Sequence, residues 1–131
     1  MLITSARATG RALYVGDGKI NTSAVHVDAA VQAYLNALDS ATSGSTFHIA
    51  SEEEPSWRQI AEAVARGIGG GCRAESVTQD QAAAEFDPFT AMFMTTNNRL
   101  NARRARREIE WDHAGHVPLL WDVAAGSYVV A

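Results

Sequence analysis

The clearest alternation of apolar and polar positions in this chain lies between residues 27 and 38. Apolar residues recur there every three or four positions, at Val27, Ala30, Val31, Tyr34, Leu35 and Leu38. This spacing predicts an amphipathic helix from about residue 28 to residue 40, with the apolar face packed on a core. We expect Asp28, at the start of the helix, to be its cap.

Short apolar runs elsewhere predict strands. Residues 12–15 and 22–27 flank the turn Gly16-Asp17-Gly18, where glycine supplies the positive φ that a tight turn needs. Residues 46–50 form a third run, Thr-Phe-His-Ile-Ala, and residues 73–77 form a fourth.

Two capping-box sequences mark further helix starts, because Ser56 stands three residues before Gln59 and Thr78 stands three before Gln81. The first box opens a helix that Gly69-Gly70-Gly71 ends. Its expected buried stripe consists of Trp57, Ile60, Ala61, Val64 and Ile68. The second box opens a short alanine-rich helix that must stop before Pro88.

The last third of the chain favours helices. Residues 89–96 favour a helix. Asn101 is a candidate cap for a second helix, which runs to about Ile109. Pro118 suits the first turn of a last helix, which runs to Tyr128. The fold class expected from all these elements is α/β, with short strands and four to five helices in a single domain over residues 1–131.

Composition narrows the function classes. The chain has 131 residues, 47% of them apolar, and a formal net charge of −4, which argues against nucleic acid as a partner. There is no apolar run long enough for a membrane span and no signal-peptide pattern at Met1. Cys72 is the only cysteine, which favours a reducing, cytoplasmic location.

Five segments in a fixed order resemble one protein family. They are Gly-Arg-Ala-Leu-Tyr-Val-Gly-Asp-Gly at 10–18, Val-His-Val-Asp at 25–28, Phe-His-Ile-Ala at 47–50, Ile-Ala-Glu-Ala-Val-Ala at 60–65 and Glu-Trp at 110–111. Residues 10–128 resemble the carboxy-terminal, substrate-binding portion of NAD-dependent epimerases/dehydratases, the extended and atypical short-chain dehydrogenase/reductases. The resemblance implies a Rossmann-like fold in which residues 46–50 are the last strand of the nucleotide-binding sheet.

Two hallmarks of that family are missing from these residues. The only glycine-rich cluster, Gly67 to Gly71, follows a helix, whereas a dinucleotide-binding turn precedes one. The only lysine, Lys19, does not stand four residues after any tyrosine, so the catalytic tyrosine–lysine pair cannot be built. We therefore expect no catalytic residue and no bound cofactor in this chain alone, and the resemblance assigns NAD or NADP to an amino-terminal half of the intact parent.

The candidate substrate-binding residues are Thr22, Ser23 and His26. The resemblance implies that His26 is the family's motif histidine on the substrate side of the sheet, although the favoured interpretation is a ring nitrogen satisfied by nearby backbone. Thr22 stands where nucleotide-sugar epimerases of this family commonly place an arginine, and a hydroxyl cannot neutralise a diphosphate. Ser23 could bind substrate or satisfy a strand end.

Other polar groups have simpler interpretations. A solvated helix face is favoured for the basic cluster, with phosphate binding left open; its members are Arg99, Arg103, Arg104, Arg106 and Arg107. Glu52-Glu53-Glu54 is expected to be a solvated loop, although in the family this loop can border the active cleft. His113 and His116 lack a flanking ligand set, so no metal is expected. An idle thiol is favoured for Cys72.

Two functional hypotheses follow. In the first, the chain is the substrate-binding part of an NAD(P)-dependent oxidoreductase or epimerase that acts on a small carbonyl or hydroxyl substrate, and it is not catalytic alone. In the second, it is a non-catalytic interaction module derived from that family. Such a module could form a homo-oligomer, because exposed apolar surface favours self-association.

Overall fold

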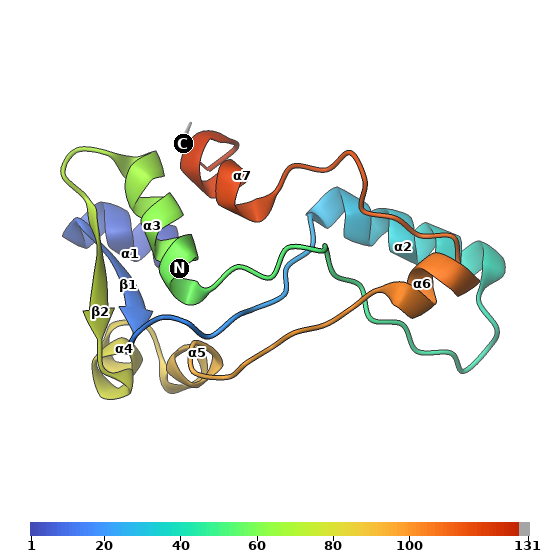
Figure 1. Ribbon diagram of the computed structural model, residues 1–131, viewed down its shortest axis with the longest axis horizontal. Helices are drawn as coiled ribbons and strands as arrows, with labels where there is room; N and C mark the ends of the chain where they lie inside the picture. Colours follow the sequence, from blue (N-terminus) through green and yellow to red (C-terminus); the bar gives the residue numbers. More distant parts are fainter. Residues whose placement is uncertain (129–131) are drawn as a thin grey trace. The chain divides into compact units, whose positions relative to one another are not determined.

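The computed structural model describes residues 1–128 and divides the chain into two compact units. The first unit comprises Met1–Thr22, Pro55–Asn98 and the residues from Leu120 on, and the second comprises Ser23–Glu54 and Arg99–Leu119. The fold class is α/β, with seven helices and one two-stranded sheet among the described residues (Figure 1).

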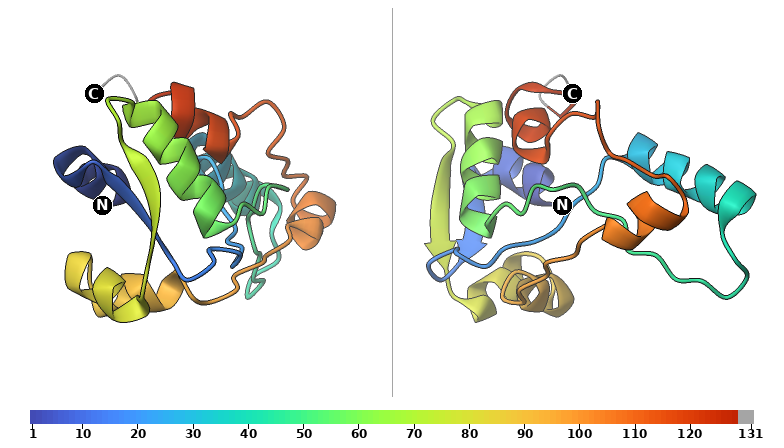
Figure 2. Two further views of the ribbon diagram at one scale, coloured as in Figure 1. Left: turned by 60° about the vertical axis from the view of Figure 1, so that its left-hand side comes forward. Right: turned by 45° about the vertical axis from the view of Figure 1, so that its right-hand side comes forward.

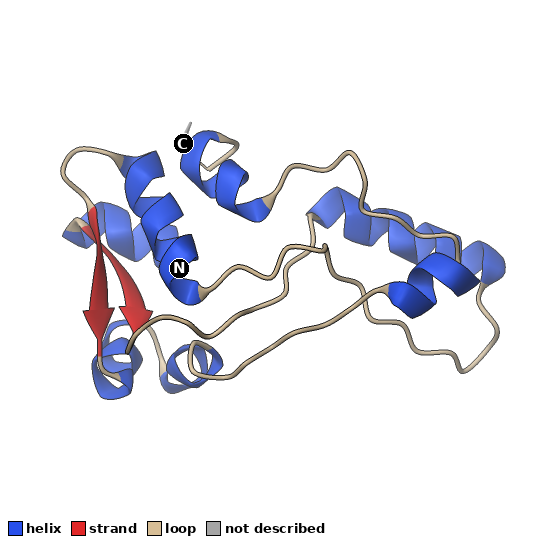
Figure 3. Ribbon diagram, viewed as in Figure 1, coloured by secondary structure: helices blue, strands red, loops and turns tan. Residues whose placement is uncertain are grey.

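The first unit is built on two parallel strands, β1 (Arg11–Val15) and β2 (Arg73–Val77) (Figure 3). They pair in register from Arg11 opposite Arg73 to Val15 opposite Val77. Parallel strands need a long crossover connection, and here it contains α3 (Trp57–Ile68), which packs along both strands (Figure 2). Helix α1 (Leu2–Thr9), for which the sequence analysis made no prediction, packs against β1 and α3.

The rest of the first unit consists of three short helices. They are α4 (Gln79–Glu85), α5 (Pro88–Phe93) and α7 (Leu119–Ala125). Leu13 and Val77 of the sheet form a buried cluster with Ala82 of α4 and Ala91 of α5. This cluster is the apolar contact between the strands and the helices that follow them.

The second unit is built around α2 (Val27–Ser40) and α6 (Arg103–Glu108). Its core contains one large ring among small side chains: Trp111 with Ile109, Ala29, Ala33, Ala102 and Ala105, all at most 2% exposed. The indole Nε1–H of Trp111 donates to the carbonyl oxygen of Ala29 at 2.7 Å. This bond fixes the alanine face of α2 against the chain that follows α6.

The predicted period of α2 is confirmed, but its predicted buried face is wrong. Val27, Val31, Tyr34, Leu35 and Leu38 are between 51% and 83% exposed, whereas Ala29 and Ala33 on the other side are buried. The indole of Trp111 can reach the backbone of α2 only where side chains are small, so the alanine face packs inward. The large apolar face is left uncovered among the described residues.

Two predicted strands are not formed. Residues 22–27 contain only an isolated bridge at Thr22, because β1 pairs with β2 and not with the segment after its own turn. Residues 46–50 form no strand, and Phe47 and Ile49 pack on the core of the second unit instead. A strand is defined by its pairing, which an apolar run does not specify.

The capping signals of the first unit are confirmed. Ser56 with Gln59 and Thr78 with Gln81 both form reciprocal capping boxes, and Gly69, with a φ of 63°, ends α3. Helix α5 starts with Pro88, after Asp87 accepts the backbone N–H of Thr90 at 2.9 Å. The Thr90 hydroxyl donates to the other carboxylate oxygen of Asp87 at 2.6 Å, and the two bonds together lower the pKa of Asp87.

Other helix boundaries differ by small amounts from the predictions. The N-cap of α6 is Ala102, while the Asn101 side chain accepts from the N–H of Arg103 at 3.4 Å. Helix α7 begins one residue after Pro118, and Tyr128 lies beyond its end. The described residues contain seven helices against the predicted four to five; α1 was not predicted, whereas α5 corresponds to the helix favoured over residues 89–96. None of the described helices has the length and apolar character that a membrane crossing requires.

Trp111→Phe is expected to lower the free energy of unfolding by about 1–2 kcal/mol, because the variant removes one buried hydrogen bond and part of a tightly packed ring. Urea titration followed by circular dichroism measures the change. Trp121→Phe is the matched control, since Trp121 is 56% exposed. Equal effects of the two variants would contradict a special role for Trp111.

Candidate functional site

A polar cleft of about 360 Å³ lies within the second unit. One wall comes from residues 50–54, and the other comes from residues 100–106, which include the start of α6. The residues that line it are Ala50, Ser51, Glu52, Glu54, Leu100, Asn101, Ala102, Arg103 and Arg106.

Ser23 and Ala24 hold the two walls together. The hydroxyl of Ser23 accepts the backbone N–H of Leu100 at 2.7 Å. The carbonyl oxygen of Ala24 accepts both the backbone N–H and the hydroxyl of Ser51, at 2.8 and 2.9 Å. Two neighbouring residues therefore bind one wall each, which gives Ser23 a structural role at this cleft.

Charges of both signs line the cleft, and most of them are paired. Arg106 forms a salt bridge of 2.9 Å with Glu52. Arg99 bonds Glu54 through Nε at 2.7 Å, and the hydrogen bond and charge of that glutamate raise the pKa of Arg99. Arg103 is the exception: within the described residues its guanidinium bonds only the amide oxygen of Asn101, at 3.2 Å. It is the group of the cleft best able to bind an acidic or hydroxyl-bearing ligand.

The remaining arginines of α6 follow the favoured interpretation of a solvated face. Arg104 and Arg107 both bond Glu108, at 2.9 Å each. The hydrogen bonds from Arg107 and Arg104 lower the pKa of that glutamate. Arg104 also lies over the ring of Phe47, 5.1 Å from its centroid.

The structure places the three predicted substrate-binding residues in different surroundings. Thr22 belongs to the first unit, where it is 5% exposed and its N–H donates to the carbonyl oxygen of Pro55 at 3.0 Å. Ser23 and His26 belong to the second unit. Of the three, Ser23 is the residue bonded to a wall of the cleft.

His26 is the N-cap of α2. Its Nδ1 accepts the backbone N–H of Asp28 at 3.2 Å, which confirms the interpretation of a ring nitrogen satisfied by backbone. The predicted cap, Asp28, instead lies in the first turn of the helix, where its carboxylate suits the positive end of the helix dipole. The ring of His26 faces the ring of His116, with centroids 5.2 Å apart.

One group of side chains in the described residues could hold a metal ion. His26, Asp28 and His116 each offer one ligand atom, and these atoms all lie within 4.8 Å of one another. His113 is used elsewhere, since its Nε2 accepts the backbone N–H of Glu52 at 3.4 Å.

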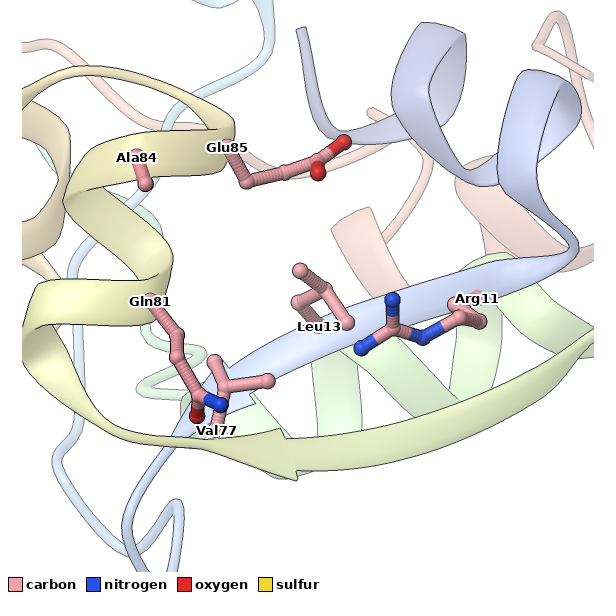
Figure 4. Close-up of a pocket in the computed structure, with 6 residues that line it drawn as sticks. All are labelled: Arg11, Leu13, Val77, Gln81, Ala84 and Glu85. Atoms are coloured by element: carbon pink, nitrogen blue, oxygen red, sulfur yellow. The ribbon is translucent and has the colours of Figure 1, made fainter.

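A second hollow, which we name the sheet pocket, lies in the first unit and has a volume of about 260 Å³ (Figure 4). Its polar groups are already engaged in the fold. Arg11 bonds both carboxylate oxygens of Glu75, at 2.8 and 2.9 Å, and Glu85 accepts the hydroxyl of Ser5 at 2.6 Å. The hydrogen bond from Arg11 lowers the pKa of Glu75. Because Arg11 and Glu85 are each bonded to a neighbouring side chain, the polar cleft is the better candidate for function.

Sequence reasoning missed four polar residues of the cleft: Ser51, Asn101, Arg103 and Arg106. The arginines were assigned to a solvated face and the acidic loop to solvent. Two alternatives left open anticipated part of the arrangement: phosphate binding by the arginine cluster, and an acidic loop that borders a cleft. The available signal was complementarity, because an acidic run at 52–54 and a basic run at 103–107 can pair across a groove.

Comparisons with known proteins found two distant relatives. The chain is 27% identical over 128 residues to "Uncharacterized protein C2A9.02" of Schizosaccharomyces pombe, which covers 98% of this chain and 42% of that protein. It is 25% identical over 125 residues to "Uncharacterized protein YLL056C" of Saccharomyces cerevisiae, which covers 95% of this chain and 41% of that protein. No protein-family profile matches the chain. The chain thus spans about two-fifths of the length of the curated relatives it matches.

His26→Ala is expected to lower the free energy of unfolding by about 1 kcal/mol, because it removes the side chain that caps α2. His26→Asn is the matched control: asparagine is a strong N-cap and should keep most of the stability. Thermal unfolding followed by circular dichroism measures both. Equal loss in the two variants would contradict a capping role.

Proposed function

We propose that this chain is the substrate-binding portion of a longer NAD(P)-dependent oxidoreductase or epimerase, and that it is not catalytic alone. The observation that carries the proposal is the polar cleft. Its lining combines hydrogen-bonding groups with Arg103. The lining groups that could act as nucleophile or base are engaged elsewhere, since the Ser51 hydroxyl donates to the carbonyl oxygen of Ala24 and the carboxylates of Glu52 and Glu54 pair with arginines. Such a lining suits binding and orientation of a ligand.

The length of the relatives supports the same proposal. Nearly all of this chain matches about two-fifths of each relative, so the matched residues form part of a longer polypeptide in both yeasts. The order of the motifs at 10–18, 25–28, 47–50, 60–65 and 110–111 supports the family. In that family NAD or NADP supplies the hydride chemistry, and the half that binds it lies outside the motifs present here.

The residues of the cleft suggest the class of substrate. Arg103, Asn101 and Ser51 offer donors and acceptors suited to a small compound with carbonyl, hydroxyl or carboxylate groups. Thr22 and the pairing of Arg99 and Arg106 with glutamates count against a nucleoside diphosphate sugar, whose two phosphates need unpaired cations.

The proposal predicts that the purified chain does not bind NAD or NADP with micromolar affinity. The reason is that the dinucleotide-binding turn of the family is missing from this sequence. Isothermal titration calorimetry with each dinucleotide measures the affinity.

In the same samples, a panel of small ketones, aldehydes and hydroxy acids should shift amide resonances of residues 50–54 and 100–106. Arg103→Ala should weaken the shifts, and Arg107→Ala, outside the lining, should not. Saturable micromolar binding of either dinucleotide would contradict the proposal.

A second candidate function, self-association, is favoured by the exposed face of α2. Four of its residues, Val27, Val31, Tyr34 and Leu38, follow a four-three-four spacing, which is typical of the seam between two packed helices. Their exposure is unfavourable in water, and contiguous exposed apolar surface of this kind marks interaction sites. A second copy of the same helix could cover it.

Charge selects the orientation of such a helix pair. Asp28 and Asp39 are eleven residues apart, about three turns, so they lie on the same edge of the face. An antiparallel pair would place Asp28 of one copy beside Asp39 of the other, whereas a parallel pair keeps the two acidic edges on opposite sides. The parallel arrangement is therefore the one that this candidate requires.

If α2 mediates self-association, Leu35→Glu is expected to convert dimers to monomers at concentrations of tens of micromolar, as measured by sedimentation velocity. Phe89→Glu is the matched control, since Phe89 is 70% exposed on α5. In a Cys72→Ser background, Leu38→Cys should form a disulfide-linked dimer only in the parallel arrangement. A wild-type chain that stays monomeric would rule out this candidate and leave the first one standing.

A further inference from the structure

The start of α2 and the loop before α7 bring two histidines and an aspartate together from positions far apart in the sequence. One ligand atom from each of His26, Asp28 and His116 lies within 4.8 Å of the others. The two rings have centroids 5.2 Å apart and planes 16° apart. We propose that these three side chains form a binding site for Zn²⁺ or a similar divalent transition metal ion.

The donor set suits such an ion. Two imidazoles and one carboxylate, with a water in the remaining position, are a recurrent ligand set for zinc and for other first-row divalent metals. Metal–ligand bonds of about 2.0–2.1 Å place the ligand atoms of a tetrahedral site roughly 3.4 Å apart. The carboxylate of Asp28 lies 3.7 Å from Nδ1 of His26, close to that separation. The side chain of Asp28 is 73% exposed and has space to turn toward the rings.

The ring of His116 points to a ligand because the protein does not otherwise use it. It is partly buried, and within the described part of the chain neither of its ring nitrogens makes a hydrogen bond. In the described part of the chain it stacks on the ring of His26. The lone pairs of imidazole nitrogens lie in the ring planes, so an ion would bind at the edge of the stacked pair, and the two rings and the carboxylate of Asp28 would turn toward it.

Metal binding has a defined structural cost at His26. In the metal-free protein Nδ1 carries a lone pair, because it accepts the N–H of Asp28. A neutral imidazole has one protonated nitrogen, so an ion at Nε2 moves the proton to Nδ1, and an ion at Nδ1 occupies the lone pair directly. In either case the Asp28 amide loses its acceptor, and its environment must change when metal binds.

This proposal departs from the sequence-based expectation of no metal. The pair His113 and His116 alone offers too few ligands, and the structure assigns His113 to the backbone of Glu52. The residues that complete the set, His26 and Asp28, stand nearly ninety positions earlier. The site is independent of the proposed oxidoreductase function, since no residue of the cleft lining belongs to it.

Calorimetric titration of ZnCl₂ into the full chain tests the site. We expect one ion per chain with a micromolar dissociation constant, and bound Co²⁺ should give the intense visible absorption of a tetrahedral site. His116→Asn and His26→Asn should each weaken binding at least about tenfold. Asparagine keeps the N-cap of α2, so His26→Asn remains folded. Lowering the pH should weaken binding, because protons compete with the metal for the ring nitrogens.

Two controls and one independent signal complete the experiment. His48→Asn should bind zinc as the wild type does, since His48 is exposed and lies outside the cluster, and so should Cys72→Ser. On zinc addition, the amide resonance of Asp28 should shift in the ¹H–¹⁵N spectrum. Absence of saturable binding below millimolar zinc would overturn the site. Binding that survives His116→Asn, or that is lost in either control, would overturn it as well.

Discussion

The contact between Trp111 and the alanine face of α2 determines the arrangement of the second unit. A buried indole N–H must find an acceptor, and the one it finds is the backbone carbonyl of Ala29, 2.7 Å away. That distance is possible only because Ala29 and Ala33 present methyl groups to the ring. The same contact turns the large apolar residues of α2 outward and leaves His26 at the start of the helix. Both the exposed face and the histidine cluster therefore depend on one hydrogen bond and two small side chains.

Local signals were read correctly from the sequence because their physics is local. The capping boxes at Ser56 and Thr78 and the glycine end of α3 each involve residues within a few positions of one another. The strands at 12–15 and 73–77 were also predicted, although their parallel pairing was not. The predicted strands at 22–27 and 46–50 are not formed, since pairing depends on distant segments that an apolar run does not specify.

The candidate site was harder to predict for a related reason. Its walls come from residues 50–54 and 100–106, and they are joined by hydrogen bonds to the Ser23 hydroxyl and the Ala24 carbonyl oxygen, which no periodic pattern in the sequence predicts. Ser23 was expected either to bind substrate or to satisfy a strand end, and in the structure its hydroxyl accepts the backbone N–H of Leu100. The face of α2 was misassigned because hydrophobicity alone favours burying leucine and tyrosine over alanine. An indole that needs a nearby carbonyl reverses that preference.

The inverted packing of α2 also changes which positions of this helix can vary. A side chain larger than a methyl group at position 29 or 33 would push the indole away from its carbonyl, so these unremarkable alanines are the sensitive positions for folding. Tyr34, Leu35 and Leu38, by contrast, are between 51% and 83% exposed. If related proteins keep large apolar residues at these positions, a binding partner covers the face. If related proteins have polar residues there, the face is exposed to solvent.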